Sequence, residues 1–168
     1  MSKKDSITTF DFQTGLGGVI PSTQEAYNKV INSQITLKKE TENIKQFKIN
    51  FEKTIINKLK LLATFPTKKE VFVFIVQYFN SVKDYSSRDI DNMAKTILDT
   101  LKGKFYYNDS QVKTLLVQKD IKDYIPQDFI YVAIKEIKNE RDVEAVKISG
   151  IDRARTYYNE FKKTIKLL

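Results

Sequence analysis

The chain has 168 residues, of which 41% are hydrophobic and 30% charged, a balance typical of a globular domain with its own core rather than of a disordered chain. It contains no Cys, His or Trp, which excludes disulfides, thiolate nucleophiles, His-dependent catalytic triads and zinc sites built from Cys or His. Any bound metal must therefore have oxygen ligands, which favours a hard ion such as Mg²⁺ or Mn²⁺.

The net charge indicates a polyanionic partner. Lys and Arg total 29 against 21 Asp and Glu, a formal charge of +8, which favours binding to nucleic acid or to an anionic membrane surface. The longest apolar run, residues 71–76, is too short to cross a bilayer, and the first residues lack the apolar core of a signal peptide. We therefore expect a cytoplasmic protein with no membrane association.

In the first half of the chain the pattern predicts one strand and one long helix. Residues 7–12 are expected to form a strand, and the glycines and proline of residues 15–22 predict a turn or loop. Helical character is expected over residues 22–64 and is ended by Pro66. The apolar positions that predict this helix are Ile44, Phe47, Phe51, Ile55, Leu59 and Leu62.

The middle of the chain predicts a buried strand followed by an amphipathic helix. Residues 71–76 are β-branched or aromatic throughout, as in a strand covered on both faces, and a polar loop is expected over residues 80–87. A helix is predicted over residues 89–102, with Gly103 as its C-terminal cap. Its apolar positions lie on a single face: Ile90, Met93, Ala94, Ile97, Leu98 and Leu101.

The last third predicts two strands and a final helix. The strands are expected at residues 112–118 and 129–137, and helical character from about residue 150 onward. The order β-α-β-α-β-β-α indicates an α+β fold in which a small mixed sheet packs against helices. We expect one domain over residues 1–168, with a C-terminal helical extension at about 141–168.

A group of carboxylates surrounds the start of the second predicted helix. Asp89 and Asp91 lie at the loop-to-helix junction, Lys95 lies one turn later on the same face, and Asp99 follows on that face. Asp109 lies just before the next strand. If the strand start packs beside the helix start, three acids can converge on one divalent cation, which would activate water to attack a phosphodiester. Lys95 would place positive charge near the scissile phosphate.

The same residues also have an ordinary structural interpretation. Asp89 suits a helix N-cap, and Asp91 in the first turn is favoured by the helix dipole. Asp91 and Lys95 form a common i,i+4 ion pair, and Asn-Asp before a strand is common in turns. Spacing alone therefore favours the structural interpretation over a metal site.

A longer motif favours the metal site over the structural interpretation. The sequence Arg-Asp-Ile-Asp-Asn-x-x-Lys-x-x-x-Asp-x-Leu, followed by Asn-Asp-Ser-Gln-Val, resembles the signature of the RusA family of Holliday-junction resolvases. That signature is Asp-φ-Asp-Asn-x-x-Lys-x-x-x-Asp-x-Leu, then Asp-Asp-x-Gln-Val. The resemblance covers residues 70–137 and implies a RusA-like fold, a homodimer, Mg²⁺ or Mn²⁺ as cofactor and four-way DNA junctions as substrate.

Carried over to this chain, the resemblance makes Asp89, Asp91 and Asp109 the catalytic metal-binding acids and Lys95 the catalytic lysine. Asp99 matches a further acid of the motif and is expected to support the site.

The chain departs from the family pattern at two positions. The first acid of the Asp-Asp pair is Asn108 here, which keeps a carbonyl oxygen but loses a charge, so its expected role is a supporting one. Gln24 stands where the family has Asn in an N-terminal Pro-Ser-x-Asn pattern. The tail beyond about residue 139 has no counterpart in the resemblance.

Basic residues are expected to contact DNA phosphates. The alternative is that they form only the solvent-exposed face of a surface helix, since both roles give the same sequence pattern. Tyr106 and Tyr107 stand just before Asp109 and offer a surface for stacking on an exposed base, with core packing as the alternative. The basic residues expected to bind DNA are Lys45, Lys48, Lys53, Arg88, Lys102 and Lys104.

The leading functional hypothesis is a metal-dependent endonuclease that resolves Holliday junctions by paired phosphodiester hydrolysis. A twofold dimer suits a four-way junction, which has approximate twofold symmetry. A non-catalytic DNA-binding accessory protein would keep the basic residues without needing the acids. A phosphohydrolase acting on small phosphoesters would keep the acids but gain little from the net charge.

Overall fold

The computed structural model describes residues 10–22, 30–31, 34–35, 42–122 and 126–165, and its centre is a four-stranded mixed sheet with the order β1-β6-β4-β5. Strand β6 pairs antiparallel with β1 and with β4, whereas β4 and β5 are parallel. The strands are β1 (Phe12–Gly17), β4 (Val71–Phe79), β5 (Val112–Ile121) and β6 (Phe129–Glu136). A separate antiparallel pair joins β2 (Val30–Ile31) to β3 (Gln34–Ile35).

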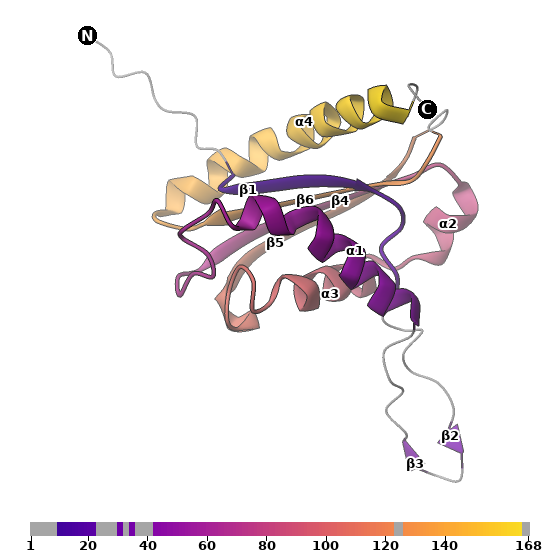
Figure 1. Cartoon of the computed structure of the whole chain (residues 1–168), viewed down its shortest axis with the longest axis horizontal. Coiled ribbons are helices and arrows are strands. Elements are labelled where there is room, and N and C mark those ends of the chain that lie inside the picture. The colour runs from indigo at the N-terminus through magenta and orange to yellow at the C-terminus, as the bar shows by residue number, and fades with distance from the viewer. Residues whose placement is uncertain (1–9, 23–29, 32–33, 36–41, 123–125, 166–168) are drawn as a thin grey trace.

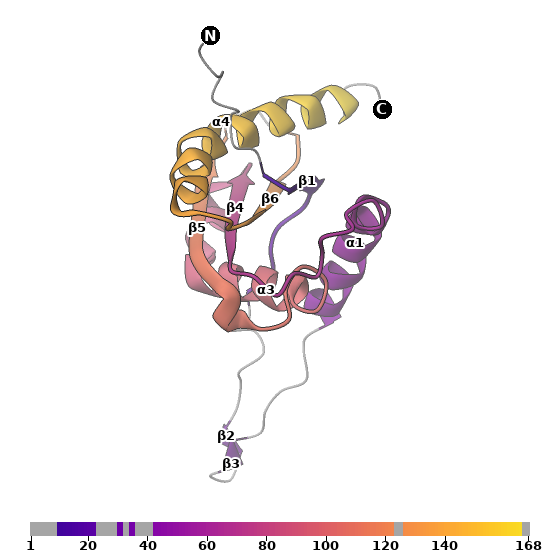
Figure 2. The ribbon, with the colours of Figure 1, turned by 90° about the vertical axis from the view of Figure 1, so that its left-hand side faces the viewer.

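Helices cover both faces of the sheet (Figures 1 and 2). Helices α1 (Glu42–Leu59) and α3 (Ile90–Leu101) lie on one face, and α4 (Glu140–Ile165) crosses the other. A short helix, α2 (Val82–Ser87), and a 3-10 turn, η2 (Asp109–Gln111), flank α3. None of the described helices is long and apolar enough to span a membrane.

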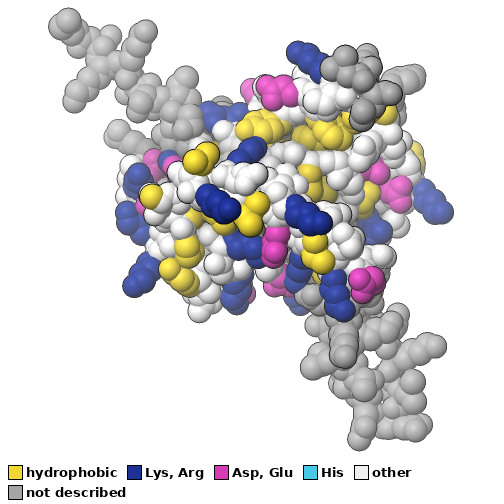
Figure 3. Space-filling model, viewed as in Figure 1, with side chains coloured by type: hydrophobic (Ala, Val, Ile, Leu, Met, Phe, Trp, Pro, Cys, Tyr) yellow, Lys and Arg dark blue, Asp and Glu magenta, His cyan; other side chains and the backbone are white. Residues whose placement is uncertain are grey.

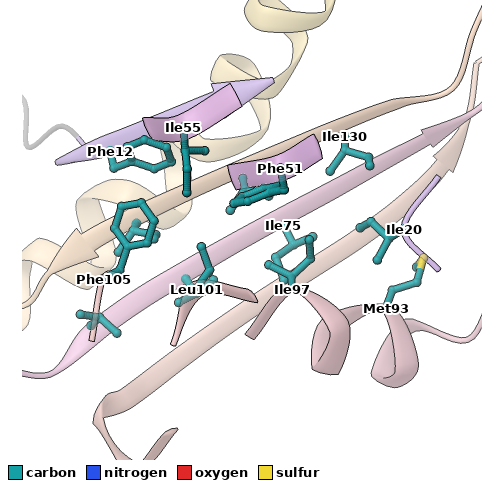
Figure 4. Packing of buried hydrophobic residues seen from close by; sticks show 14 of the residues in the cluster. Phe12, Ile20, Phe51, Ile55, Ile75, Met93, Ile97, Leu101, Phe105 and Ile130 are labelled. Atoms are coloured by element: carbon teal, nitrogen blue, oxygen red, sulfur yellow. The ribbon is translucent and has the colours of Figure 1, made fainter. Parts of the chain in front are cut away.

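Strand β4 lies in the middle of three layers, with the sheet between α1 and α3 on one side and α4 on the other. All nine of its residues are buried. Val73 and Ile75 face the core beneath α1 and α3, and Phe72 and Phe74 face the core beneath α4. A strand buried on both faces reads as a continuous apolar run, which is how residues 71–76 appear in the sequence. Figure 4 shows the first of these cores, where Phe51, Ile75 and Ile97 come from three different elements.

The predicted α+β class, the mixed sheet and the C-terminal helix are confirmed, but the first strand lies further along than predicted. It runs through Gly15 and Gly17, which the sequence indicated as part of a turn, while residues 7–9 lie outside the described part of the chain. A Cβ atom at Gly15 would lie 2.6 Å from the Phe129 ring, so this strand needs glycine for close packing.

The helix predicted over residues 22–64 is shorter in the structure. It begins at Glu42, just before the first buried position, Ile44, and the strands β2 and β3 lie within the segment predicted as its first part. Nothing in that first part has helical apolar spacing, so the prediction extended a real pattern beyond its start.

Two further boundaries were wrong because capping residues were overlooked. Helix α2 occupies the predicted loop, and the Ser81 hydroxyl accepts a hydrogen bond from the Asp84 backbone N–H at its start. Helix α4 begins at Glu140, close to the expected start of the C-terminal extension at about 141 but ten residues before position 150, where the helical pattern was predicted to begin. There the Asp142 carboxylate accepts hydrogen bonds from the backbone N–H groups of Lys138 and Asn139.

Gly150 allows α4 to pack closely on the sheet, and its replacement is expected to destabilise the fold. A Cβ atom there would lie 2.9 Å from the buried Phe74 ring. Gly150→Val should lower the free energy of unfolding by about 1–3 kcal/mol, because overpacking outweighs the gain in helix propensity. Urea unfolding measures this, with Ile151→Val at the neighbouring, partly exposed position as the control. Equal midpoints for Gly150→Val and the native chain would contradict this packing.

Candidate functional site

The carboxylate of Asp89 stands at the start of α3 without serving as its cap. Asp89 occupies the N-cap position, and its backbone carbonyl accepts a hydrogen bond from the Met93 N–H, but its side chain makes no capping hydrogen bond. The carboxylate of an N-cap aspartate normally accepts hydrogen bonds from the backbone N–H groups of the first turn. The structural interpretation of Asp89 as a cap is therefore not supported, and its carboxylate is open to solvent.

The exposed face of α3 carries the charged residues of the motif. Asp91, Lys95 and Asp99 are all exposed, while Met93 and Ile97 on the opposite face are fully buried. This is the single charged face that the i, i+4, i+8 spacing predicts.

The backbone just before the motif is fixed by strand β5. The ammonium of Lys119 donates hydrogen bonds to the backbone carbonyls of Tyr85, at 2.8 Å, and Arg88, at 2.7 Å. It also lies 4.3 Å from the centre of the Tyr85 ring. The C-terminal part of β5 therefore lies beside the N-terminal end of α3 and holds the segment that leads into Asp89.

Asp109 lies near the other end of α3. Its carboxylate Oδ2 is 3.0 Å from the ammonium of Lys102, the C-cap residue of that helix. A helix of 12 residues is about 18 Å long, so Asp109 is far along the helix from Asp89 and Asp91. Among the described residues, no group of three or more acids is arranged to hold a metal ion. The predicted convergence of three acids is therefore not found within one chain, and one chain alone does not fit the expected divalent ion.

The direction of β5 is the reason. Because β5 is parallel to β4, the chain must travel back along α3 before β5 begins, and the start of β5 meets the end of α3. The sequence prediction instead placed the start of this strand beside the start of α3.

Asn108 and Gln111 hold Asp109 in place. The Asn108 side chain accepts a hydrogen bond from the Ser110 N–H, and the Gln111 Oε1 atom accepts from the Asn108 N–H at 2.9 Å. The Gln111 amide also donates to the backbone carbonyls of Thr67 and Lys69, at 2.8 and 2.9 Å. The Asn and Gln of the motif thus form a capping box that fixes the Asp109 backbone to the segment before β4.

Of the two tyrosines considered for base stacking, only one is accessible. Tyr106 is fully buried and its hydroxyl donates to the Leu98 carbonyl, so the stacking prediction is wrong for this residue. Burial, together with the negative charges of Asp109 and Asp99, raises the pKa of its phenol well above the usual value. Tyr107 is 53% exposed and remains available to a ligand.

The basic residues predicted to bind DNA differ in their surroundings. Lys45 and Lys53 are exposed on α1 and Lys48 is partly exposed, and Figure 3 shows Lys and Arg side chains spread over the face that carries this helix. Lys104 lies 2.8 Å from Glu52, and Lys102 pairs with Asp109, so both of these charges are partly neutralised within the chain.

A cavity of about 330 Å³ lies between the end of β1, the first half of α1 and Arg88. The sequence analysis missed it, although three amide side chains at helical spacing were visible as its signal. The polar residues that line it are Asn43, Gln46, Asn50 and Arg88. Arg88, which precedes Asp89 in the chain, is the residue of the motif that lines it.

Comparison with known proteins identifies a family. A comparison with curated proteins found no match. Among solved structures, CetZ from Methanosaeta thermophila strain DSM 6194 is 14% identical with a TM-score of 0.24, covering 61% of this chain and 27% of that one. That likeness is too low to bear on fold or function. The family described as endodeoxyribonuclease RusA matches residues 17–135, which begin at the last residue of β1 and include α1, the whole motif and nearly all of β6. Both halves of the motif lie inside that match, and the chain belongs to the RusA endodeoxyribonuclease family.

Proposed function

We propose that this protein is a metal-dependent, structure-selective endodeoxyribonuclease that resolves four-way DNA junctions as a homodimer, by paired phosphodiester hydrolysis. Family membership supports endonuclease activity on DNA. The observation that carries the proposal is the exposed N-terminal end of α3, where Asp89, Asp91 and Lys95 occupy the motif positions. The Asp89 side chain there makes no capping hydrogen bond.

The residues of the motif have distinct roles in the proposal. Asp89 and Asp91 offer carboxylate oxygens, the ligands that Mg²⁺ and Mn²⁺ prefer, and Asp109, at the opposite end of α3 in its own chain, is proposed as the third acid, supplied by the second copy of the homodimer. A divalent cation, when bound, supplies positive charge against the phosphodiester and lowers the pKa of a bound water. Lys95 lies one turn from Asp91 and would stabilise the negative charge that develops on the phosphate. Asp99 and Asn108 are supporting residues.

In this proposal, DNA affinity comes from the basic residues of α1 and from Arg88 rather than from the acids. Lys45, Lys48 and Lys53 on α1 would contact phosphates, and Arg88 would contact the DNA next to the acids. Contacts of this kind read the shape and charge of a branched duplex rather than its base sequence.

Neutralising the α1 lysines should weaken binding without changing catalysis at saturation. We expect Lys48→Ala with Lys53→Ala to reduce junction affinity and to lower the slope of log affinity against log salt by about one unit for each lost phosphate contact. Binding measured in EDTA over a salt series gives both quantities. Lys163→Ala on α4, across the sheet from α1, is the control. Identical salt slopes for the double variant and the control would exclude α1 from the DNA interface.

A cleavage assay tests the proposed function. The purified protein is incubated with a labelled four-way junction and with a linear duplex of the same sequence, in Mg²⁺, in Mn²⁺ and in EDTA. We expect cleavage of the junction only with a divalent ion, and little cleavage of the duplex. Tight junction binding without cleavage in either metal would instead identify a non-catalytic DNA-binding protein on the same scaffold.

A further inference from the structure

Lys119 lies on the core-facing side of β5, an unusual place for a charged side chain. Side chains alternate along a strand, so Lys119 is on the same face as Val117, which packs against the core beneath α1 and α3. Its backbone pairs with Gln77 of the fully buried strand β4. A lysine can lay its methylene stem along such a surface while its ammonium reaches polar partners beyond it. The partners of this ammonium therefore indicate the role of the residue.

The partners of Lys119 belong to the turn between α2 and α3. Its ammonium donates hydrogen bonds to the backbone carbonyls of Tyr85 and Arg88 and also lies over the Tyr85 ring. Tyr85 is in the last turn of α2, and Arg88 is the C-cap residue of that helix, with extended backbone. The last carbonyls of a helix have no partner within it, so Lys119 supplies donors that α2 lacks.

Helix α2 needs such support because it is short. It has six residues, none of them buried, and a helix of this length is not stable without contacts to the rest of the protein. Its start is capped by Ser81, and the Tyr85 ring packs edge-on against Phe79 with 6.0 Å between the ring centres. Lys119 reaches further along the chain than either contact, to Arg88, the residue immediately before Asp89.

We infer that Lys119 is a positioning residue for the proposed nuclease, because it fixes the backbone from which the Asp89 carboxylate projects. This inference rests on the proposed function. The Asp89 side chain makes no capping hydrogen bond to α3, so the placement of its carboxylate depends on the backbone that carries it. Lys119 acts through that backbone rather than on the DNA. A misplacement of about 1 Å in a group that takes part in a reaction can lower the rate by about 10²-fold.

Lys119→Met tests this role, since it keeps a long unbranched side chain but removes all three donors. In the protein without metal or DNA, we expect faster hydrogen exchange confined to α2 and the first turn of α3. The Met93 N–H, which bonds to the Asp89 carbonyl at 3.1 Å, should report it. At saturating protein the rate of junction cleavage should fall by about 10- to 10²-fold, with nearly unchanged junction affinity in EDTA.

The matched control is Lys122→Met, at the same end of β5. The Lys122 ammonium lies 2.6 Å from the Asp120 carboxylate and 5.1 Å from the centre of the Tyr78 ring. This control therefore also removes an ammonium with a polar and an aromatic partner, but its partners are not in the turn before α3. We expect native exchange at the start of α3 and a native cleavage rate.

Chemical rescue separates the ammonium from the rest of the side chain. The chain has no cysteine, so Lys119→Cys introduces a single thiol, at a position that is partly exposed. Alkylation with 2-bromoethylamine, in which the thiolate displaces bromide, places an ammonium at the length of lysine. Alkylation with 1-bromopropane places a methyl group there instead. The first product should regain the slow exchange and the cleavage rate, and the second should not.

The outcomes distinguish this inference from the proposed function. A native cleavage rate for Lys119→Met would overturn the positioning role, as would equal rates for the two alkylated forms. Exchange that rises equally throughout the sheet would indicate a general loss of stability and would also overturn it. Failure of the proposed nuclease would be seen in the native protein, which would then cut no junction in Mg²⁺ or Mn²⁺.

Discussion

Asp91→Asn is expected to reduce junction cleavage by at least about 10²-fold while junction binding survives. The substitution keeps the size of the side chain but removes the negative charge and replaces one accepting oxygen with an NH₂ donor. Removal of one group that stabilises a transition state typically costs this much. Because the site faces a polyanion, loss of an acid also lowers repulsion toward DNA, so binding should be equal or tighter. Asp89→Asn and Asp109→Asn should behave alike.

The measurement is single-turnover cleavage at saturating protein, beside binding in EDTA. Asp152→Asn is a matched control, since this aspartate is exposed on α4, across the sheet from α3. Circular dichroism establishes that each variant is folded. A folded Asp91→Asn protein that cleaves at the native rate would remove Asp91 from the site.

Lys95→Ala should lower the rate of cleavage by about 10²-fold and leave junction affinity nearly unchanged, because one ammonium beside the phosphate acts on developing charge rather than on a long stretch of backbone. If Lys95 serves only as an i,i+4 partner of Asp91, its loss costs a few tenths of a kcal/mol of helix stability and turnover is intact.

The experiment must keep the protein dimeric, because the proposed nuclease acts as a homodimer. It is therefore run at a protein concentration where sedimentation shows the same dimer for the variant and the native chain. Lys53→Ala is the control, with the opposite expectation of weaker binding and an unchanged rate at saturation. If Lys95→Ala turns over at the native rate under these conditions, the residue has a structural role only.

Elements with a long apolar pattern were predictable from sequence. Helix α3 was predicted to within a residue at each end, because its stripe from Ile90 to Leu101 covers the whole element. Strand β4 was found from its uninterrupted apolar run. Helix α2 buries no residue and is held by the Ser81 cap, so periodicity carried no signal for it.

For the candidate site, the motif proposes residues but does not give their arrangement. It predicts Asp89, Asp91, Lys95 and Asp109, and their mutual placement depends on the direction of β5, which the motif does not specify. A parallel strand-helix-strand unit requires the chain to return along the helix, and this rule alone sends Asp109 to the far end of α3. The role of Gln111 as the anchor of that turn depended on contacts with Thr67 and Lys69, which are distant in sequence.

The most direct test of paired hydrolysis on a branched substrate is a map of the nicks. Four versions of one four-way junction, each labelled on a different strand, are incubated with the native protein and Mg²⁺. The proposed function predicts nicks in two opposite strands at positions related by the twofold symmetry of the junction, with the linear duplex cut far more slowly. Cutting of the duplex at a comparable rate, or nicks in a single strand only, would contradict it.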